Sequence, residues 1–314
     1  MKIAIIGTGA VGGYYGALLQ KNGLDVHFLV HNDYKYVREH GLVVDSVNGD
    51  MILPKINAYR RPEDMPRCDI AVVALKTTAN EALKTILPRV VKPDATIVVL
   101  QNGLGVESQV LKILPGATVM GGLCFLCANK IGPGHVRHLD YGAIRMGQYR
   151  MDEKAAGISG QLNEVHEIFT ASGVPVDLTD NLGKARWEKL VWNIAFNGLS
   201  VILNADTRAL IRSEPSRALL RTIMLEVIAG ARSCGYDIAD EFAEAMIAAT
   251  EKMVPYEPSM KLDYDGKRPL EIDAIYRRPI QAAAESGYAM EKIPVIMLQL
   301  EYFDQYNRSV TPVS

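Results

Sequence analysis

The chain has 314 residues, which is long enough for about two domains with buried cores. It is 48% hydrophobic and 22% charged, with a formal net charge of -2. This balance argues against a nucleic-acid or anionic-membrane surface, because such surfaces need concentrated Lys and Arg. No apolar run approaches the roughly 20 residues of a membrane span, and no signal-peptide pattern is present. We therefore expect a cytoplasmic protein.

Cysteines are too few and too scattered for a disulfide framework; they are Cys68, Cys124, Cys127 and Cys234. Cys124 and Cys127 form one C-x-x-C, but there is no second pair and no histidine at ligand spacing. His135 and His138 also have no partner ligands nearby in the sequence. We expect reduced, buried thiols and no metal site.

Short apolar runs alternate with helical stretches through the first half of the chain. The runs are "KIAII" at 2–6, "DVHFLV" at 25–30, "DIAVVAL" at 69–75, "TIVVL" at 96–100 and "TVMGGLCFL" at 118–126. This pattern predicts a parallel sheet covered on both faces, as in a doubly wound Rossmann-type α/β domain. The segment "GPGHVRHLDYGAIRMGQ" predicts an antiparallel extension of the sheet, followed by a helix near 156–171 and a last strand at "VPVDL".

After about residue 180 the pattern becomes purely helical. Helices that bury stripes against one another, instead of against a sheet, indicate a second domain. The sequence thus predicts a Rossmann-type domain at 1–180 and an all-helical domain at 181–314. The apolar C-terminal helix "IPVIMLQLEYFDQY" can pack within its own domain or across a homodimer, and both arrangements stay open.

The N-terminal motif "KIAIIGTGAVGG" places G-x-G-x-x-G directly after a strand and at the start of a helix. Gly7 is expected to turn the chain tightly, Gly9 to let a diphosphate approach the main chain, and Gly12 to let helix and strand pack closely. The free N–H groups of the helix start would hold the diphosphate. The expected cofactor loop consists of Gly7, Thr8, Gly9, Ala10, Val11 and Gly12.

The end of the second strand usually decides between the two nicotinamide cofactors, through an acid for ribose hydroxyls or a basic group for an extra phosphate. Here the strand ends in "LVHND", and Lys35 and Arg38 follow. There is no acid at the strand tip, although Asp33 is near. We predict NADP with a contact from His31, which could equally be an exposed loop residue, and NAD stays open.

Two polar residues follow later strands at the same edge of the predicted sheet. Lys76 follows the third strand in "VALKT", and Asn102 follows the fourth in "VLQNG". Ligands of open parallel sheets bind outside the carboxyl ends of the strands, so both residues are expected beside cofactor or substrate. The alternatives are a solvated turn lysine and a turn-forming Asn-Gly.

The segment "WEKLVWNIAFNGLSVILN" is apolar on nearly all sides except for one polar stripe. Wound as a helix, the stripe contains Lys189, Asn193, Asn197, Ser200 and Asn204. Such a helix is buried, so the stripe should face something polar: either a ligand or a polar network between helices. If hydride adds to the carbon of a bound carbonyl group, negative charge grows on the carbonyl oxygen, and a lysine there can stabilise that charge and protonate the oxygen.

The motifs G-x-G-A-V-G, "LKT", "QNG", W-E-K-L-x-x-N-x-x-x-N and "PSM…EID" occur in this order. In this combination the chain resembles the ketopantoate reductase (2-dehydropantoate 2-reductase) family along nearly its whole length. "KLVWNIAFN" and "SMKLDYDGKRPLEID" are its most specific segments. The resemblance implies that hydride from NADPH reduces the ketone of 2-dehydropantoate to (R)-pantoate, on the way to pantothenate and coenzyme A.

The resemblance also implies roles for individual residues. Lys189 would be the general acid, and Glu271 would help to organise cofactor and substrate. Asn193 and Asn197 would hold the substrate, and Ser259 would bind its carboxylate. The further residues implied to lie beside cofactor or substrate are Lys76, Asn102 and the main chain near Cys127.

Three departures from the family pattern concern cofactor choice or substrate fit. His31 stands where many members have Arg, and Thr207 replaces an expected Asn. Tyr276 and Arg277 stand where the family often has Asn-Gly, which favours a paralogue that reduces another small 2-oxo acid as the alternative. A non-catalytic dinucleotide sensor is a further alternative, but a sensor would be expected to lose the acid and substrate groups that this chain retains.

Overall fold

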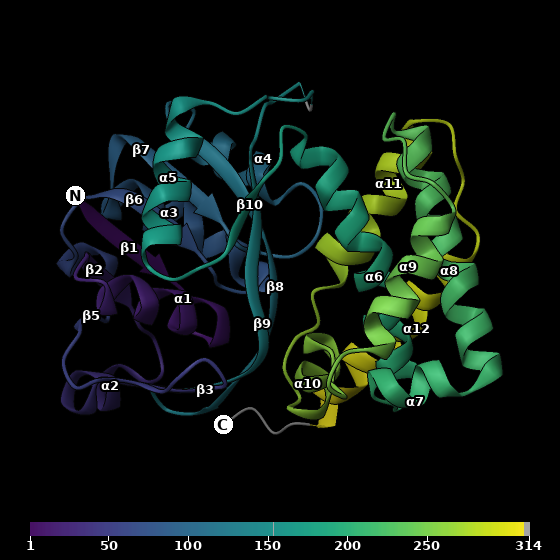
Figure 1. Ribbon diagram of the computed structural model, residues 1–314, viewed down its shortest axis with the longest axis horizontal. Coiled ribbons are helices and arrows are strands. Elements are labelled where there is room, and N and C mark those ends of the chain that lie inside the picture. The colour runs from purple at the N-terminus through teal and green to yellow at the C-terminus, as the bar shows by residue number, and fades with distance from the viewer. Residues whose placement is uncertain (153, 311–314) are drawn as a thin grey trace. The chain divides into compact units, whose positions relative to one another are not determined.

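The computed structural model describes residues 1–152 and 154–310 (Figure 1). The chain forms two compact units. The first contains Met1–Gln101 and Val106–Leu182, and the second contains Asn102–Gly105 together with the chain from Gly183 onward.

The first unit is built on one mixed sheet in the order β4-β3-β9-β8-β7-β6-β1-β2-β5, and β10 pairs with β9. Its strands are β1 (Lys2–Ile6), β2 (Asp25–Leu29), β3 (Leu42–Ser46), β4 (Met51–Leu53), β5 (Asn57–Tyr59), β6 (Cys68–Val73), β7 (Val91–Val99), β8 (Thr118–Gly132), β9 (His135–Gln148) and β10 (Val176–Leu178). The predicted Rossmann-type strands are confirmed: β2, β1, β6, β7 and β8 run parallel. β8 and β9 form the predicted antiparallel extension.

Burial explains why these central strands were readable from the sequence. Ile3, Ile5 and Ile6 of β1 have no exposed surface, because helices cover both faces of the sheet. The short strands β3, β4 and β5 were not predicted. β3 pairs parallel with β9 and antiparallel with β4, and β5 pairs with β2 at the other edge.

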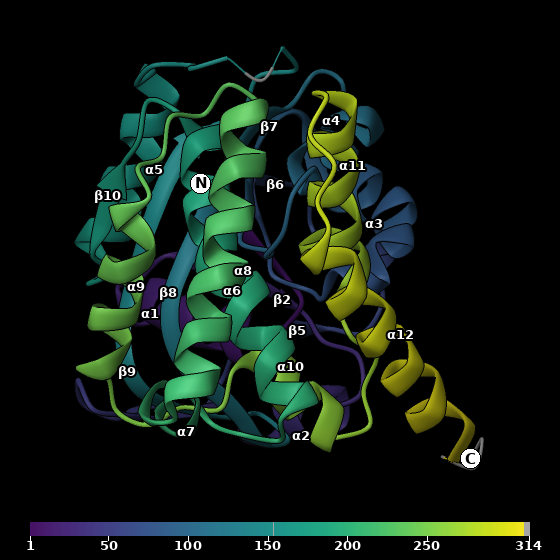
Figure 2. The same ribbon diagram turned by 90° about the vertical axis from the view of Figure 1, so that its right-hand side faces the viewer.

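The helices of the first unit are α1 (Ala10–Lys21), α2 (Tyr34–His40), α3 (Leu83–Val90), α4 (Val106–Ile113) and α5 (Gly160–Ala171), with 3-10 turns at Pro62–Asp64 and Thr77–Ala82. α1 and α5 lie on one face of the sheet, and α3 and α4 on the other (Figure 2). α5 begins at Gly160, later than predicted, because the Ser159 hydroxyl accepts a 3.1 Å hydrogen bond from the Leu162 N–H and caps the helix there.

The second unit is helical, as predicted. Its helices are α6 (Leu182–Ile202), α7 (Thr207–Arg212), α8 (Glu214–Ser233), α9 (Glu241–Glu251), α10 (Ser259–Asp265), α11 (Arg278–Glu285) and α12 (Lys292–Val310), with a π-helical turn at Asp273–Arg277. α6 supplies Trp187, Leu190 and Ile194 to the core. Within the described residues, no helix has the length and apolar character that a membrane crossing requires.

The loop Asn102–Gly105 packs with the second unit, although the sequence prediction placed residues 1–180 together. The Leu104 N–H donates a 2.9 Å hydrogen bond to the Ala274 main-chain oxygen. Gly103 has a φ of +98°, and a side chain there would come within 2.5 Å of Ala274. Only glycine allows this close approach without strain.

α12 packs by one face and exposes the other. Ile293 and Leu300 are fully buried, whereas Leu298 and Tyr302 are 61% and 65% exposed. The helix begins against Glu226 of α8, whose carboxylate accepts hydrogen bonds from the first N–H groups of α12. The C-terminal helix is therefore anchored in its own unit while keeping an exposed apolar row.

Candidate active site

The glycine-rich loop has the local geometry that the motif predicts. Gly7 has a φ of +100°, and a Cβ on it would lie 2.4 Å from the Leu75 nitrogen. A Cβ on Gly12 would lie 2.1 Å from the Gly7 oxygen. Both glycines are therefore required by the packing of α1 against the strand ends.

Gly9 differs from these two glycines. It caps α1 with φ -89°, and a Cβ on it would meet nothing within 4 Å. Among residues 1–152 and 154–310, no atom accounts for the missing side chain, whereas a diphosphate approaching the main chain would. Thr8 beside it donates a 3.2 Å hydrogen bond to the Leu29 oxygen, which ties the loop to the end of β2. Ala10 and Val11 form the first turn of α1, whose N–H groups are available to an anion.

The end of β2 carries His31, which is exposed and lies 2.6 Å from the Asn32 side-chain oxygen through Nδ1. Asp33 is engaged elsewhere. Its carboxylate lies 2.5 Å from the Lys130 ammonium and accepts a 3.0 Å hydrogen bond from the Gly134 N–H. The nearest acid after the strand is thus held by β8 and the β8–β9 turn.

Lys76 is exposed at the start of the 3-10 turn that follows β6. Sequence reasoning missed its neighbour in this region, Gln101. This buried amide donates to the Leu75 oxygen at 2.8 Å and to the Asn80 side chain at 2.6 Å, so it joins the loops after β6 and β7. The glutamine is visible in the motif "QNG" after the fourth predicted strand, but the sequence alone does not show which groups it bonds to.

The cysteines are free thiols. Cys127 is buried in β8 opposite Asp140 of β9, at a register shift of the ladder. Burial raises the pKa of the Cys68 thiol to about 11. No group of metal-ligating side chains occurs among residues 1–152 and 154–310.

The polar stripe of α6 is largely buried. Asn193 and Asn197 are 3% and 2% exposed, and Ser200 is fully buried, with its hydroxyl donating a 2.9 Å hydrogen bond to the main-chain oxygen of Asn197. The prediction for Asn204 is wrong: α6 ends at Ile202, and Asn204 has a φ of 49° outside the helix. Asparagine tolerates this left-handed conformation, which terminates the stripe.

Asn197 carries the most informative atom of the stripe. Within the described chain, its buried Oδ1 has no hydrogen-bond partner. An unsatisfied buried acceptor costs about 1–3 kcal/mol, so it is rarely kept without a reason. A donor supplied by a bound molecule is one such reason.

Lys189 lies two turns earlier on the same face of α6. Its ammonium nitrogen lies 5.8 Å from the centre of the Trp192 ring, at cation–π distance. Trp192 is itself fixed, because its indole N–H donates a 3.0 Å hydrogen bond to the Thr250 hydroxyl. The ring therefore gives the lysine a defined position.

Asn102 and Asn193, predicted from separate motifs, meet in the structure. The Asn193 amide donates a 3.4 Å hydrogen bond to Asn102 Oδ1. This contact lies within the second unit, because the Asn102–Gly105 loop packs there. Two of the predicted substrate residues are thus brought together.

Glu271 and Ser259 occupy other elements of the second unit. Glu271 is 5% exposed and lies two residues before the start of the π-helical turn, a feature frequent at functional sites. Ser259 is half-buried at the first position of α10. Among the described residues its hydroxyl makes no hydrogen bond, which leaves the hydroxyl available to a ligand.

Tyr276 and Arg277 do not support a changed substrate. Tyr276 is fully buried in the helical core, and its hydroxyl donates a 2.9 Å hydrogen bond to the Ile194 oxygen. Burial raises the pKa of this hydroxyl, so it remains a donor. Arg277 is half-exposed and forms ion pairs with Glu301 and Asp273. Tyr276 is therefore a core residue, and Arg277 is a surface residue.

The sequence is similar to known proteins along most of its length. Two profiles match it: "Ketopantoate reductase PanE/ApbA" over residues 3–151, and "Ketopantoate reductase PanE/ApbA C terminal" over residues 181–300. Together they cover most of its length. The chain belongs to the ketopantoate reductase family.

Individual ketopantoate reductase relatives agree with this assignment. A 2-dehydropantoate 2-reductase from Nostoc sp. is 49% identical over 98% of this chain and 97% of its own. The solved 2-dehydropantoate 2-reductase from Geobacter metallireducens is 43% identical, with a TM-score of 0.92 over 96% of this chain and 99% of its own. The solved 2-dehydropantoate 2-reductase from Methylococcus capsulatus is 29% identical, with a TM-score of 0.87 over 100% of this chain and 99% of its own. This ketopantoate reductase family member is an NAD(P)H-dependent oxidoreductase.

Proposed function

We propose that the protein reduces the ketone of 2-dehydropantoate to (R)-pantoate with NADPH. The observation that carries the proposal is the α6 stripe, where Lys189 shares one helix face with Asn193 and the unsatisfied Asn197 oxygen. Full-length similarity to proteins named 2-dehydropantoate 2-reductase supports the choice of substrate. A role in pantothenate and coenzyme A biosynthesis, a cytoplasmic location and a homodimer stay predictions.

Lys189 is the proton donor of this proposal. The nicotinamide, when bound, supplies hydride to the ketone carbon. Negative charge then grows on the ketone oxygen, and the Lys189 ammonium stabilises it and gives up a proton from Nζ. Attraction to the Trp192 ring, 5.8 Å away, keeps the ammonium on this face of α6.

The remaining groups bind and orient the oxo acid. The Asn197 amide offers an acceptor for the substrate hydroxyl, and the Asn193 amide is aligned by Asn102. The Ser259 hydroxyl is proposed to hold the carboxylate. Glu271 is proposed to organise substrate and cofactor from the turn beside the Asn102–Gly105 loop.

The choice of NADPH over NADH rests on the end of β2. Asp33, the nearest acid, is held by Lys130 and Gly134, which argues against a ribose-hydroxyl contact from it. His31, Lys35 and Arg38 are exposed after the strand and offer donors to a 2'-phosphate. Gly7, Thr8, Gly9, Ala10, Val11 and Gly12 are proposed to hold the diphosphate, with Lys76 and the Cys127 main chain nearer the nicotinamide.

The test is the loss of reduced-cofactor absorbance when purified protein meets 2-dehydropantoate with NADPH or with NADH. We expect fast oxidation of NADPH and a kcat/KM for NADH lower by about tenfold or more, the effect of losing one charged contact. If the protein demonstrably binds NADPH but does not oxidise it in the presence of 2-dehydropantoate, the assignment of 2-dehydropantoate as the substrate is overturned. Equal use of both cofactors would overturn the choice of NADPH only.

A further inference from the structure

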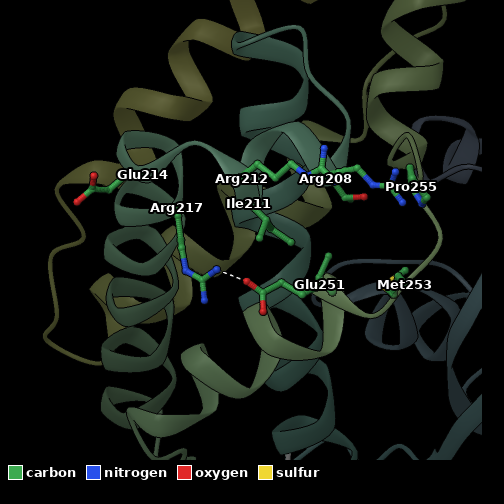
Figure 3. Close-up of a pocket in the computed structure, with 10 residues that line it drawn as sticks. Arg208, Ile211, Arg212, Glu214, Arg217, Glu251, Met253 and Pro255 are labelled. Carbon is green, nitrogen blue, oxygen red and sulfur yellow. Dashed lines mark hydrogen bonds and ion pairs between the residues drawn. The ribbon is translucent and has the colours of Figure 1, made fainter.

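A cavity of about 560 Å³ lies in the helical unit, within the size range of small-molecule sites. It is formed by α7, the start of α8, the end of α9 and the chain that follows α9 (Figure 3). Thr207 stands at a position that the family resemblance ties to cofactor choice or substrate fit, and the other lining residues are not among those proposed to hold substrate or cofactor. The cavity therefore has no assigned occupant.

The cavity is rich in arginine. Arg217 forms an ion pair with Glu251 on one side, and Glu214 points away from Arg208 and Arg212 (Figure 3). Within the described parts of the chain, Arg208 and Arg212 form no ion pair or side-chain hydrogen bond. They are four residues apart on α7, and like charges at this spacing repel. The wall of the cavity thus carries two positive charges that an anion would neutralise.

We propose that this cavity binds a small anion with a phosphoryl group, held by Arg208 and Arg212. Guanidinium groups are planar forks that pair with phosphate oxygens through two hydrogen bonds. Two such forks on one wall match an anion with two or more charges. An anion bound by both guanidinium groups would offset the repulsion between Arg208 and Arg212.

The floor of the cavity connects to the helix that carries Lys189. Thr250 lines the cavity, is 4% exposed and accepts the hydrogen bond from the Trp192 indole. The Trp192 ring in turn lies against the Lys189 ammonium. A ligand that shifts Thr250 would move the ring that positions the lysine.

A second connection leads to the segment that carries Ser259. Thr207 lines the cavity and is 1% exposed. Its hydroxyl accepts a hydrogen bond from the Tyr256 N–H at 3.2 Å, and its own N–H donates to the Tyr256 oxygen at 3.2 Å. Tyr256 lies on the segment leading into α10, which begins at Ser259. Occupation of the cavity is therefore proposed to alter the reductase activity, a consequence that rests on the proposed function.

Pyrophosphate is the probe for binding, which calorimetry measures with NADP+ at saturation so that the glycine-rich loop is filled. The test variant is Arg208→Gln/Arg212→Gln. The matched control is Arg61→Gln/Arg150→Gln, which removes the same charge from two exposed ion pairs of the other unit. We expect the test variant to bind pyrophosphate about tenfold or more weakly and the control to bind as wild type does.

Absent binding in the wild type, or equal weakening in both double variants, would overturn the site. Citrate binding as tight as that of pyrophosphate would overturn the phosphoryl assignment. These results are independent of turnover, so they stand apart from a failure of the proposed function. In the activity measurement, pyrophosphate should change the KM for 2-dehydropantoate in wild type and control but not in the test variant. An unchanged KM in wild type that binds pyrophosphate would overturn the coupling.

Discussion

The Tyr276 hydroxyl and the main-chain oxygen of Ile194 are joined by a 2.9 Å hydrogen bond that links the π-helical turn after Glu271 to the middle of α6. The same hydroxyl lies 2.8 Å from where a Cβ on Gly198 would stand. Gly198 thus makes room for Tyr276. These contacts fix the π-helical turn, and with it the segment around Glu271, against the middle of α6.

We predict that Gly198→Ala destabilises the protein by about 1–3 kcal/mol, because the methyl group would overlap Tyr276 and Ile296. Tyr276→Phe should cost about 1 kcal/mol, because Ile194 keeps its intrahelical bond. The double variant should lose less unfolding free energy than the sum of the two single losses, because phenylalanine lacks the hydroxyl that the alanine methyl group would overlap. Urea denaturation of all four proteins measures this, and strict additivity would contradict it.

Lys189→Ala should lower kcat by about 10²–10⁴-fold while leaving the Kd for NADPH within about twofold, because the residue acts on the ketone oxygen. Stopped-flow turnover and fluorescence titration of the cofactor separate the two quantities. Lys184→Ala, a lysine on the same helix, serves as the control. Equal kcat in wild type and Lys189→Ala would remove the lysine from the mechanism.

The glycine loop offers a matched pair of variants. Gly12→Ala should destabilise the protein strongly, because its Cβ would lie 2.1 Å from the Gly7 oxygen. Gly9→Ala should change stability by less than about 1 kcal/mol, because its Cβ meets nothing and its φ of -89° suits alanine. Gly9→Ala should nevertheless weaken NADPH binding by about tenfold or more, as a calorimetric titration would register. Cofactor affinity unaltered by Gly9→Ala would exclude a diphosphate at this position.

Asn197→Ala should separate substrate binding from stability. The side-chain oxygen has no partner in the described chain, so its removal should cost the fold no more than about 1 kcal/mol. KM for 2-dehydropantoate should rise by about tenfold or more, because a buried hydrogen bond to the substrate is lost. Thermal denaturation and initial rates test the two halves. A large loss of stability with unchanged KM would assign Asn197 to the core.

Glu226 should make stability depend on pH. Burial raises the pKa of its carboxyl, but the hydrogen bonds from the first N–H groups of α12 outweigh this and lower it overall. Because the folded pKa lies below the unfolded one, this stabilisation is present above the ordinary glutamate pKa of about 4.3 and is lost as pH falls through the folded pKa. Glu226→Gln should be less stable than wild type by about 1–2 kcal/mol at neutral pH, and the gap should close at acid pH. A gap independent of pH would contradict this assignment.

The sequence predicted the fold and the geometry of the glycine-rich loop correctly where a local pattern of residues reflects burial or a steric requirement. β1 and β6 are runs of Ile and Val that are covered on both faces, so their identity as strands was predictable. Gly7 and Gly12 were predictable because only glycine meets the close contacts of the turn. Sequence reasoning failed where long-range partners decide, as for β3, which exists as a strand through its pairing with β9.

Partners also explain the missed features of the candidate site. Gln101 acquires its role from Leu75 and Asn80, which no spacing rule connects to it. Tyr276 looked like a residue that alters the substrate site, yet it is a core residue matched to Gly198. Such pairs are three-dimensional facts, and one sequence does not reveal them.

The loop Asn102–Gly105 has a consequence for dissecting the enzyme into fragments. The polypeptide passes between the two units at Gln101–Asn102, at Gly105–Val106 and at Leu182–Gly183. A fragment that begins at Gly183 would therefore lack the strand-end loop that bonds to Ala274 and would leave the Asn193 amide without its partner. A synthetic peptide bearing this loop is the piece that such a fragment lacks, so a single cut at Leu182–Gly183 would produce two incomplete halves.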